Sequence, residues 1–317
     1  MPKRVRNLLV FTVVTATFAV SAVLLYVCFV QAQGMVAFRA APRTAYTTTP
    51  ADLGMTTYQA MHVTSFDDLR LEGWYVPPAV GSSGASIVFV HGHRGDRTQL
   101  AAERQLLAAE GYGLLTIDLR NAGTSEGSAT TMGLYETQDV ISAFEWLSAQ
   151  PGVDGQRIAL YGVSMGGTTA IRVMARLPEA RALVVDSAYS SLLELTSDKV
   201  TQVTGLPGAP FANVIVWMAS RLSNADLFAV RPIDDIASIA PRPILLMHGA
   251  IDEVIPVSHM QALYAAANEP KTLVIIPGAL HMQTYQTDPA GLPSTGIAVF
   301  ARRAAIVGFR VNIICFL

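Results

Sequence analysis

Cysteine and charge are both scarce in this 317-residue chain, and each shortage excludes a class of protein. Charged residues make up 15% of the sequence, the formal net charge is −2, and no basic run lies in the body of the chain. Nucleic acid is therefore not expected as a partner. The two cysteines are Cys28, inside an apolar run, and Cys315, near the end, which argues against a structural disulfide. No C-x-x-C pair or cluster of His and Cys has the spacing of a zinc site.

Long apolar segments, by contrast, are present, and one of them decides the expected location. Residues 8–30 carry no charge over 23 positions, enough for a helix to cross a bilayer, and Lys3, Arg4 and Arg6 precede them. The basic flank predicts a single-pass membrane protein with a cytoplasmic N-terminus and its body on the extracytoplasmic side. The alternative is a signal peptide cleaved near Val30-Gln31-Ala32, which would give a secreted protein, although the apolar run exceeds the usual ~7–15 residues. A buried helix is the third interpretation.

We expect three parts along the chain. Residues 1–32 form the anchor or signal peptide, residues 33–55, rich in Ala, Pro and Thr, form a linker, and residues 56–317 form one domain. In the domain, short apolar strands alternate with helices, which indicates an α/β fold with a mostly parallel, doubly wound sheet. The expected strands are residues 58–63, 69–78, 86–92, 112–120, 157–163, 182–188, 242–249 and 271–278, and the expected helices include 98–111, 133–150 and 166–177.

A long insertion separates two of the later strands. Residues from about 188 to 235 show no strand pattern and contain two helical segments, 191–200 and 211–222. Because an insertion of this length in a compact domain usually has a function, we expect a helical cap over the site. Its apolar side chains either face an acyl or aromatic part of the substrate or simply pack on the sheet. They include Leu206, Phe211, Val214, Trp217 and Met218.

The G-x-S-x-G sequence around Ser164 is the main indication of chemistry. Ser164 follows the strand at 157–163 and precedes a helix, and Gly162 and Gly166 flank it. Such a sharp strand-to-helix turn leaves room only for glycines beside the serine, and it exposes the hydroxyl above the sheet at a helix N-terminus. Ser164 is therefore predicted to be a nucleophile, the alternative being a structural serine in a tight turn.

A serine nucleophile needs a base, and His281 is the predicted one. It follows the last expected strand in a loop, at the edge of the sheet where Ser164 lies. Four other histidines are weaker candidates for the base. His62 lies in the first strand, His91 and His248 end strands in structural positions, and His259 begins a helix and is expected to be exposed.

The base in turn needs an acid that fixes its tautomer. Asp252 directly follows the strand at 242–249 and gives the order Ser–Asp–His along the chain. Its neighbour Glu253 should point elsewhere. Asp186, at the end of the strand at 182–188, is the main rival, while Asp118 is expected to cap a turn or pair with an arginine.

The remaining requirement is a pair of backbone donors for a developing oxyanion. The N–H of Met165, the residue after the nucleophile, is the first. The second is the N–H of His93, because Gly92 allows a tight turn after the strand at 86–92. Arg94, Asp96 and Arg97 are expected to hold this loop in place.

From about residue 58 to residue 285 the chain resembles the α/β-hydrolase superfamily. The matching segments are HGHRG, DLRNAGTSEG, GVSMGG, HGAIDEVIP and the histidine at 281. It looks most like the bacterial, often membrane-anchored, branch that includes serine aminopeptidases and acyl hydrolases. The resemblance implies a catalytic triad of Ser164, Asp252 and His281, oxyanion donors at His93 and Met165, and no cofactor.

Two segments depart from the family pattern. Asn121 stands where the family usually has a glycine, in a turn that is not catalytic. The C-terminal segment GIAVFARRAAIVGFRVNIICFL is unusually apolar for the amphipathic helix that normally closes the fold. We expect a final helix near 295–307, and the alternatives are a segment on the membrane surface or a translated frameshift tail.

The predicted activity is hydrolysis of a carboxylic ester or thioester of a small acyl substrate, through an acyl-enzyme at Ser164. The first alternative is an aminopeptidase-like serine peptidase, in which Glu194, Asp198 or Asp226 would hold a free amine. The second is a catalytically silent, membrane-tethered binding module. No sequence feature indicates an oligomeric state.

Overall fold

A single eight-stranded sheet forms the centre of the molecule. The computed structural model describes residues 2–36 and 46–289, so the helix expected near 295–307 lies outside the described residues. The strand order is β1-β2-β4-β3-β5-β6-β7-β8, and only the pairings of β2 are antiparallel. The strands are β1 (Gln59–Thr64), β2 (Arg70–Val76), β3 (Ser86–Val90), β4 (Gly113–Ile117), β5 (Ile158–Val163), β6 (Ala182–Asp186), β7 (Ile244–Gly249) and β8 (Lys271–Ile276).

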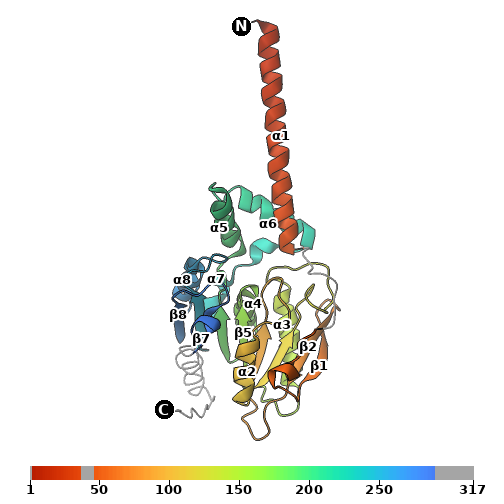
Figure 1. Ribbon diagram of the computed structural model, residues 1–317, viewed down its shortest axis with the longest axis vertical. Helices are drawn as coiled ribbons and strands as arrows, with labels where there is room; N and C mark the ends of the chain where they lie inside the picture. The colour runs from red at the N-terminus through yellow and green to blue at the C-terminus, as the bar shows by residue number, and fades with distance from the viewer. Residues whose placement is uncertain (1, 37–45, 290–317) are drawn as a thin grey trace.

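Helices cover both faces of this sheet (Figure 1). Alternating residues of one strand enter different cores, because successive side chains point to opposite faces: Leu160 belongs to one buried cluster and Tyr161 to the other. The larger cluster includes residues of α3 (Glu136–Ser148), α4 (Met165–Arg176) and α8 (Val257–Ala266). The smaller one includes Leu107 of α2 (Ala101–Ala109) and has Tyr285 of α9 (Thr284–Thr287) packed against it. The predicted α/β architecture is therefore confirmed.

The first helix, α1 (Lys3–Val36), projects from one end of the domain (Figure 1). It is long and apolar enough to cross a membrane. Its most apolar stretch of 18 residues has a mean hydropathy of 2.5, and none of that stretch is buried in the domain. Its last turns enter the domain, where Cys28, Ala32 and Val36 repeat every four residues and are buried in the larger core cluster. The helix thus continues through the first four residues of the predicted linker.

The insertion after β6 forms the predicted helical cap at the same end of the domain as α1. Its long helices are α5 (Leu192–Thr204) and α6 (Phe211–Ser223), which pack on each other, and α6 also packs against α1. Ser191 begins α5 as an N-cap by accepting a hydrogen bond from the N–H of Glu194. Three short helical turns then return the chain to the sheet: η2 (Leu227–Ala229), α7 (Pro232–Asp235) and η3 (Ile236–Ile239).

A buried ion pair fixes the loop between β3 and α2. Both oxygens of Asp118 accept hydrogen bonds from Arg97: Oδ1 from the backbone N–H, and Oδ2 from the guanidinium at 2.7 Å. Burial alone would raise the pKa of Asp118, but the guanidinium outweighs it and holds the pKa below its usual range. Asp118 therefore has the structural role predicted for it.

Asn121 lies in the turn that departs from the family pattern. Its backbone has a φ of +59°, the left-handed region that glycine adopts most easily and that asparagine tolerates better than most residues. The substitution at this position is therefore compatible with the usual turn.

Candidate active site

Ser164 occupies a strained turn between β5 and α4. Its φ of 55° and ψ of −123° lie outside the regions that side-chain-bearing residues prefer. The turn depends on its glycines: a Cβ on Gly162 would lie 2.2 Å from the carbonyl oxygen of Gly166, and one on Gly166 would lie 2.1 Å from that of Val90. A hydrogen bond to the neighbouring strand also fixes the backbone of the turn: the N–H of Ser164 donates to the carbonyl of Asp186, at the end of β6, at 2.8 Å.

The structure brings Ser164, His281 and Asp252 into one chain of hydrogen bonds. The Oγ of Ser164 lies 3.0 Å from Nε2 of His281, and Nδ1 of the same ring lies 2.7 Å from Oδ2 of Asp252. Both distances suit proton transfer from the hydroxyl to an imidazole that a carboxylate orients. Ser164 and Asp252 are buried and the side chain of His281 is 15% exposed, so solvent reaches the group mainly at the histidine.

Asp252 is held as a carboxylate. Its Oδ1 accepts hydrogen bonds from the N–H groups of Val254 and Ile255, both at 2.8 Å. Burial by itself would raise the pKa of Asp252, but the hydrogen bonds from His281 and the Ile255 N–H outweigh burial and keep the pKa below the usual value. Because the carboxylate stays charged, it favours the tautomer of His281 whose Nε2 can accept a proton.

The loop after β3 passes directly beside the serine. A Cβ on Gly92 would lie 3.1 Å from Cβ of Ser164 and 3.5 Å from the sulfur of Met282, so a side chain there would crowd the site. The next backbone N–H is that of His93, and the N–H of Met165 opens α4. Among the described residues neither of these two N–H groups has a hydrogen-bond partner. Both donors are thus available to an anionic oxygen.

The side chain of His93 is largely buried. Burial and, to a smaller extent, the nearby charge of Arg94 lower its pKa to about 4, although a hydrogen bond to the backbone of Met35 in α1 opposes them. Its Nε2 is buried and has no partner within the described part of the chain. His93 is therefore neutral at physiological pH.

Three of the other histidines lie where the sequence placed them. His62 is on the outer strand β1, and His91 is buried with its ring bonded to the Leu119 N–H at 2.9 Å and near the Gly92 carbonyl. His248 supports the acid: its Nε2 lies 2.9 Å from the carbonyl of Ile255 and 3.4 Å from Oδ2 of Asp252.

The expectation for His259 is wrong, because the side chain is buried rather than exposed. Its Nδ1 lies 2.7 Å from Oγ of Ser190, and its Nε2 lies 3.1 Å from the carboxylate of Asp198 on α5. The helix that starts after Pro256 lies against the start of the cap, and this contact is invisible in a sequence where the two segments are far apart.

The rival acid, Asp186, has other partners. Its oxygens accept hydrogen bonds from Ser187 at 2.8 Å and from Thr284 at 2.5 Å, and burial raises its pKa to about 6. Glu253, the neighbour of Asp252, is exposed. The sequence reasoning missed Ser187, which also accepts a bond from the N–H of Met282 at 3.3 Å. Its polar side chain at the end of β6, next to Asp186, was the available signal.

The sheet order and this Ser–His–Asp group define the class of the protein: it is a serine hydrolase of the α/β-hydrolase superfamily. A family model described as X-Pro dipeptidyl-peptidase (S15 family) matches residues 41–212, more than half of the 317 residues. The chain belongs to this family.

Three known proteins illustrate the likeness. The uncharacterized protein Rv2307c of Mycobacterium tuberculosis is 34% identical over 215 residues, covering 68% of this chain and 69% of the relative. The lysophosphatidylserine lipase ABHD12 of Macaca fascicularis is 26% identical over 204 residues, 61% of this chain and 48% of that protein. A solved structure of the Pyrococcus furiosus esterase Pf2001 superposes with a TM-score of 0.68 at 26% identity, covering 84% of this chain and 97% of the esterase.

Proposed function

We propose that this protein hydrolyses carboxylic ester or thioester bonds of an acyl substrate, with Ser164 as nucleophile, His281 as general base and Asp252 as the orienting acid. The observation that carries the proposal is the continuous hydrogen-bonded path from Ser164 Oγ to Asp252 Oδ2, with 3.0 Å and 2.7 Å between its atoms. The names of the esterase and lipase relatives support an acyl ester as the bond that is cleaved.

The reaction has two halves. Oγ of Ser164 bonds to the carbonyl carbon while its proton moves to Nε2 of His281, and the carbonyl oxygen becomes an oxyanion facing the N–H groups of His93 and Met165. The imidazolium then gives its proton to the departing alcohol or thiol, leaving an acyl-serine. Water attacks this ester with the same proton transfers, releases the carboxylic acid and restores the serine. The carboxylate of Asp252 stabilises the imidazolium in both halves.

Labelling with a fluorophosphonate probe tests this directly. Membrane fractions containing the wild type or Ser164→Ala are labelled, and hydrolysis of p-nitrophenyl esters of increasing chain length is measured in parallel. We expect labelling and turnover in the wild type and the loss of both in the variant. A folded wild type that neither labels nor hydrolyses any ester would contradict the enzymatic proposal and favour a silent binding module.

Peptide hydrolysis is the second candidate, supported by the description of the family model. The three acids that an aminopeptidase would need for a free amine argue against this activity, because each has a structural partner. Glu194 bonds to Ser190, Asp198 lies beside His259, and Asp226 caps a short helical turn at the N–H of Phe228. Turnover of dipeptide p-nitroanilides faster than of esters would favour the peptidase.

We also propose that α1 is a retained membrane anchor with the domain on the extracytoplasmic side. The support is its junction with the domain: Ala32 is fully buried, the carbonyl of Gly34 accepts a bond from Arg94 at 3.2 Å, and that of Val36 accepts one from Thr130 at 2.8 Å. Cleavage near Ala32 would remove Cys28 and Ala32 from the core cluster and expose apolar surface.

A further inference from the structure

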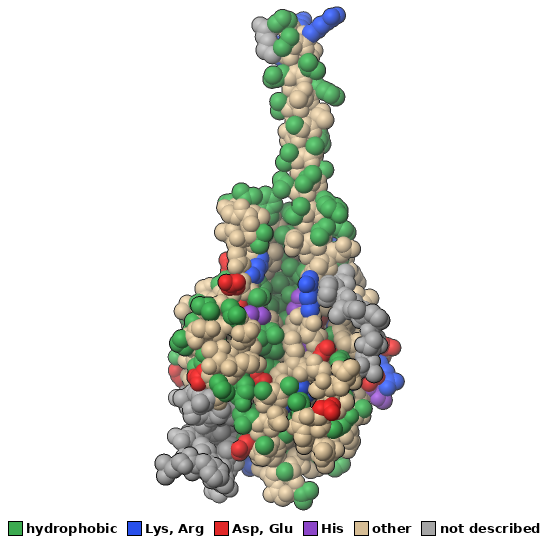
Figure 2. All heavy atoms as spheres, viewed as in Figure 1, with side chains coloured by type: hydrophobic (Ala, Val, Ile, Leu, Met, Phe, Trp, Pro, Cys, Tyr) green, Lys and Arg blue, Asp and Glu red, His purple; other side chains and the backbone are tan. Residues whose placement is uncertain are grey.

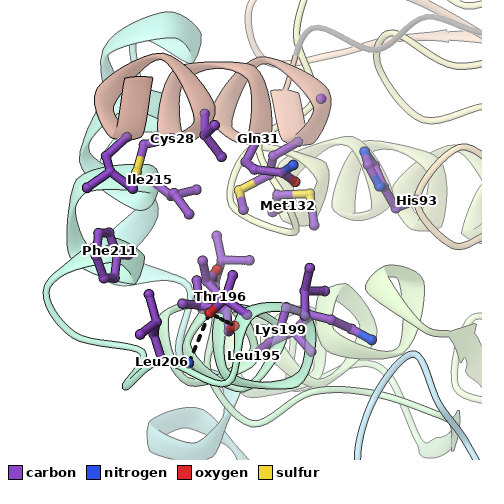
Figure 3. A pocket seen from close by; sticks show the side chains of 18 of the residues that line it. Cys28, Gln31, His93, Met132, Leu195, Thr196, Lys199, Leu206, Phe211 and Ile215 are labelled. Atoms are coloured by element: carbon purple, nitrogen blue, oxygen red, sulfur yellow. Dashed lines mark hydrogen bonds between the residues drawn. The ribbon is translucent and has the colours of Figure 1, made fainter. Parts of the chain in front are cut away.

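An apolar cavity of about 580 Å³ lies between the last turns of α1 and the cap helices α5 and α6 (Figure 3). This volume falls within the range of roughly 300–1,000 Å³ that small-molecule sites occupy. Side chains of α1, α5 and α6, among them Cys28, Leu195 and Ile215, form most of its walls. The cavity is also lined by His93, Arg94 and Met132. Figure 2 shows the corresponding hollow, lined by hydrophobic side chains, beside the base of the projecting helix.

The two ends of the cavity differ in chemistry. Figure 3 shows Cys28, Phe211 and Ile215 together at one end, and His93 and Lys199 at the other. The first end offers only carbon and sulfur to an occupant, whereas the second offers an imidazole and an ammonium group. An occupant that satisfies both ends is an amphiphile, with a hydrocarbon chain at one end and a polar group at the other.

The polar end adjoins the reacting serine. His93 lines the cavity, and the preceding Gly92 passes so close to Ser164 that a Cβ on it would lie 3.1 Å from the serine Cβ. The backbone N–H of His93 is the donor assigned above to the oxyanion. The cavity therefore reaches the loop that passes beside Ser164, so a substrate whose carbonyl lies at the serine has its hydrocarbon chain next to the polar end of the cavity.

We infer that this cavity binds the acyl chain of a membrane lipid, and that the end of α1 is a wall of the substrate site as well as an anchor. The inference rests on the proposed esterase function and adds its substrate class: an acyl ester taken from the bilayer in which α1 is embedded.

The expected position of the bilayer along α1, next to the cavity, supports a lipid as the occupant. Residues 8–27 of α1 rise about 30 Å as a helix, which equals the hydrocarbon thickness of a bilayer. Cys28 then lies at the boundary, and it belongs to the same buried cluster as Ile215 of the cap helix α6. Figure 1 shows α1 meeting the cap at this end of the domain. The cap presents exposed apolar side chains on the rim of the same cavity: Val203 is 80% exposed and Leu206 is 46% exposed. Exposed apolar side chains that gather around a cavity are typical of a surface that meets a protein or a membrane, and here the bilayer crossed by α1 is adjacent.

Positive charge at the polar end favours an anionic head group. Nζ of Lys199 donates to the carbonyl of Glu253 at 2.6 Å and to the side chain of Gln202 at 2.7 Å, and no carboxylate among the described residues pairs with it. Arg94 also lines the cavity. Two cations thus line the cavity, and cations attract a phosphate oxygen of a substrate.

Chain-length specificity tests the acyl site. The full-length protein is reconstituted in vesicles of ether-linked phosphatidylcholine, and p-nitrophenyl esters from acetate to palmitate are compared by kcat/KM. Each methylene buried in the cavity should raise kcat/KM by up to about fourfold until the cavity is full. Cys28→Trp and Ile215→Trp fill the apolar end from α1 and α6, and each should lower the ratio of palmitate to butyrate turnover by roughly tenfold or more. The matched controls, Tyr26→Trp and Asn213→Trp, add the same ring to exposed positions of these helices and should leave the ratio unchanged.

The outcomes separate the two proposals. A wild type that labels with fluorophosphonate but shows no preference for longer chains, or filled variants that keep the wild-type ratio, would overturn the acyl site and leave the esterase proposal standing. Absence of labelling and turnover in the wild type would instead overturn the esterase proposal itself. Labelling of each variant at Ser164 shows that its active site is folded.

The head group is tested with two substrates that share one acyl chain. Lysophosphatidylglycerol carries a phosphate and monoacylglycerol does not. Lys199→Gln should lower kcat/KM for the anionic substrate about tenfold more than for the neutral one. An equal loss on both substrates would show that Lys199 supports the cap only through its bonds to Gln202 and Glu253, and would overturn the anionic head group.

Discussion

Nδ1 of His281 lies 2.7 Å from Oδ2 of Asp252, although 29 residues separate the two in the sequence. They meet because β7 and β8 are parallel neighbours, so the loops that follow both strands emerge at the same edge of the sheet. Two N–H groups hold the other oxygen of the carboxylate, which leaves Oδ2 facing the imidazole.

Replacing this carboxylate should disable the proposed base. In Asp252→Asn the amide can stabilise the wrong tautomer of His281, and we expect kcat for p-nitrophenyl butyrate to fall about 10⁴-fold while the fold is kept. Glu253→Gln, at the exposed neighbouring position, is the matched control and should retain wild-type turnover. A kcat of Asp252→Asn within tenfold of the wild type would show that Asp252 does not orient the base.

Adding a methyl group at Gly92 should displace the proposed oxyanion donor. Its Cβ would lie 3.1 Å from that of Ser164, so the loop must shift and carry the His93 N–H away. We expect kcat to fall by about 10²–10³, the usual effect of losing one donor, with little change in melting temperature. Gly155→Ala, whose Cβ would make only ordinary contacts beyond 3.6 Å, should leave kcat unchanged. A fully active Gly92→Ala would remove His93 from the oxyanion site.

Removing the buried carboxylate of Asp118 should destabilise the domain strongly. The variant Asp118→Ala leaves Arg97 buried and unpaired, at a cost of about 3–5 kcal/mol in the free energy of unfolding measured with urea. The partly exposed pair of Asp154 and Arg157 provides the control, and Asp154→Ala should cost under about 1 kcal/mol. Similar losses of unfolding free energy in both variants would mean that burial does not make the pair of Asp118 and Arg97 more stabilising than an exposed pair.

Glu103 should make stability depend on pH in the direction opposite to a salt-bridged acid. The side chain is buried on α2 with one oxygen unpartnered, and burial raises its pKa from 4.5 to about 7. The folded state therefore holds a proton that the unfolded state releases, so this stabilising contribution is present below pH 4.5 and is lost as the pH rises to about 7.

The variant Glu103→Gln should remove that loss. At pH 8 we expect it to be more stable than the wild type by up to about 3 kcal/mol, and at pH 4.5 the two should be nearly equal, as measured by urea unfolding. Glu110→Gln, at the exposed end of the same helix, should follow the wild type at both pH values. Parallel pH curves for Glu103→Gln and the wild type would mean that Glu103 is ionised in the folded state.

The mass of the protein in the membrane tests directly whether α1 is retained. The full chain has a mass of 33.9 kDa, and we expect this mass in carbonate-washed membranes, with an N-terminal tag that protease added outside spheroplasts cannot reach. A protein shortened by the residues before about position 33 and found in the soluble fraction would identify a cleaved signal peptide instead.

The sequence by itself determined the elements and the chemistry of single positions. Alternation of apolar strands with helices predicted the sheet, because burial on both faces demands continuous apolar strands. The glycines around Ser164 predicted the sharp turn, since any Cβ at Gly162 or Gly166 would overlap backbone atoms. Local rules of this kind act within a few residues, so they can be read without knowing the fold.

Only the tertiary structure decided how distant segments meet. Ser164 and His281 are 117 residues apart, and their 3.0 Å contact exists because several parallel strands end at one edge. His259 was expected to be exposed, and it is buried because Ser190 and Asp198, at the start of the cap, lie against it. The end of α1 was expected to be a linker and is instead a wall of the cavity that α5 and α6 complete. Such contacts depend on packing between segments whose separation in the sequence carries no information about their distance in space.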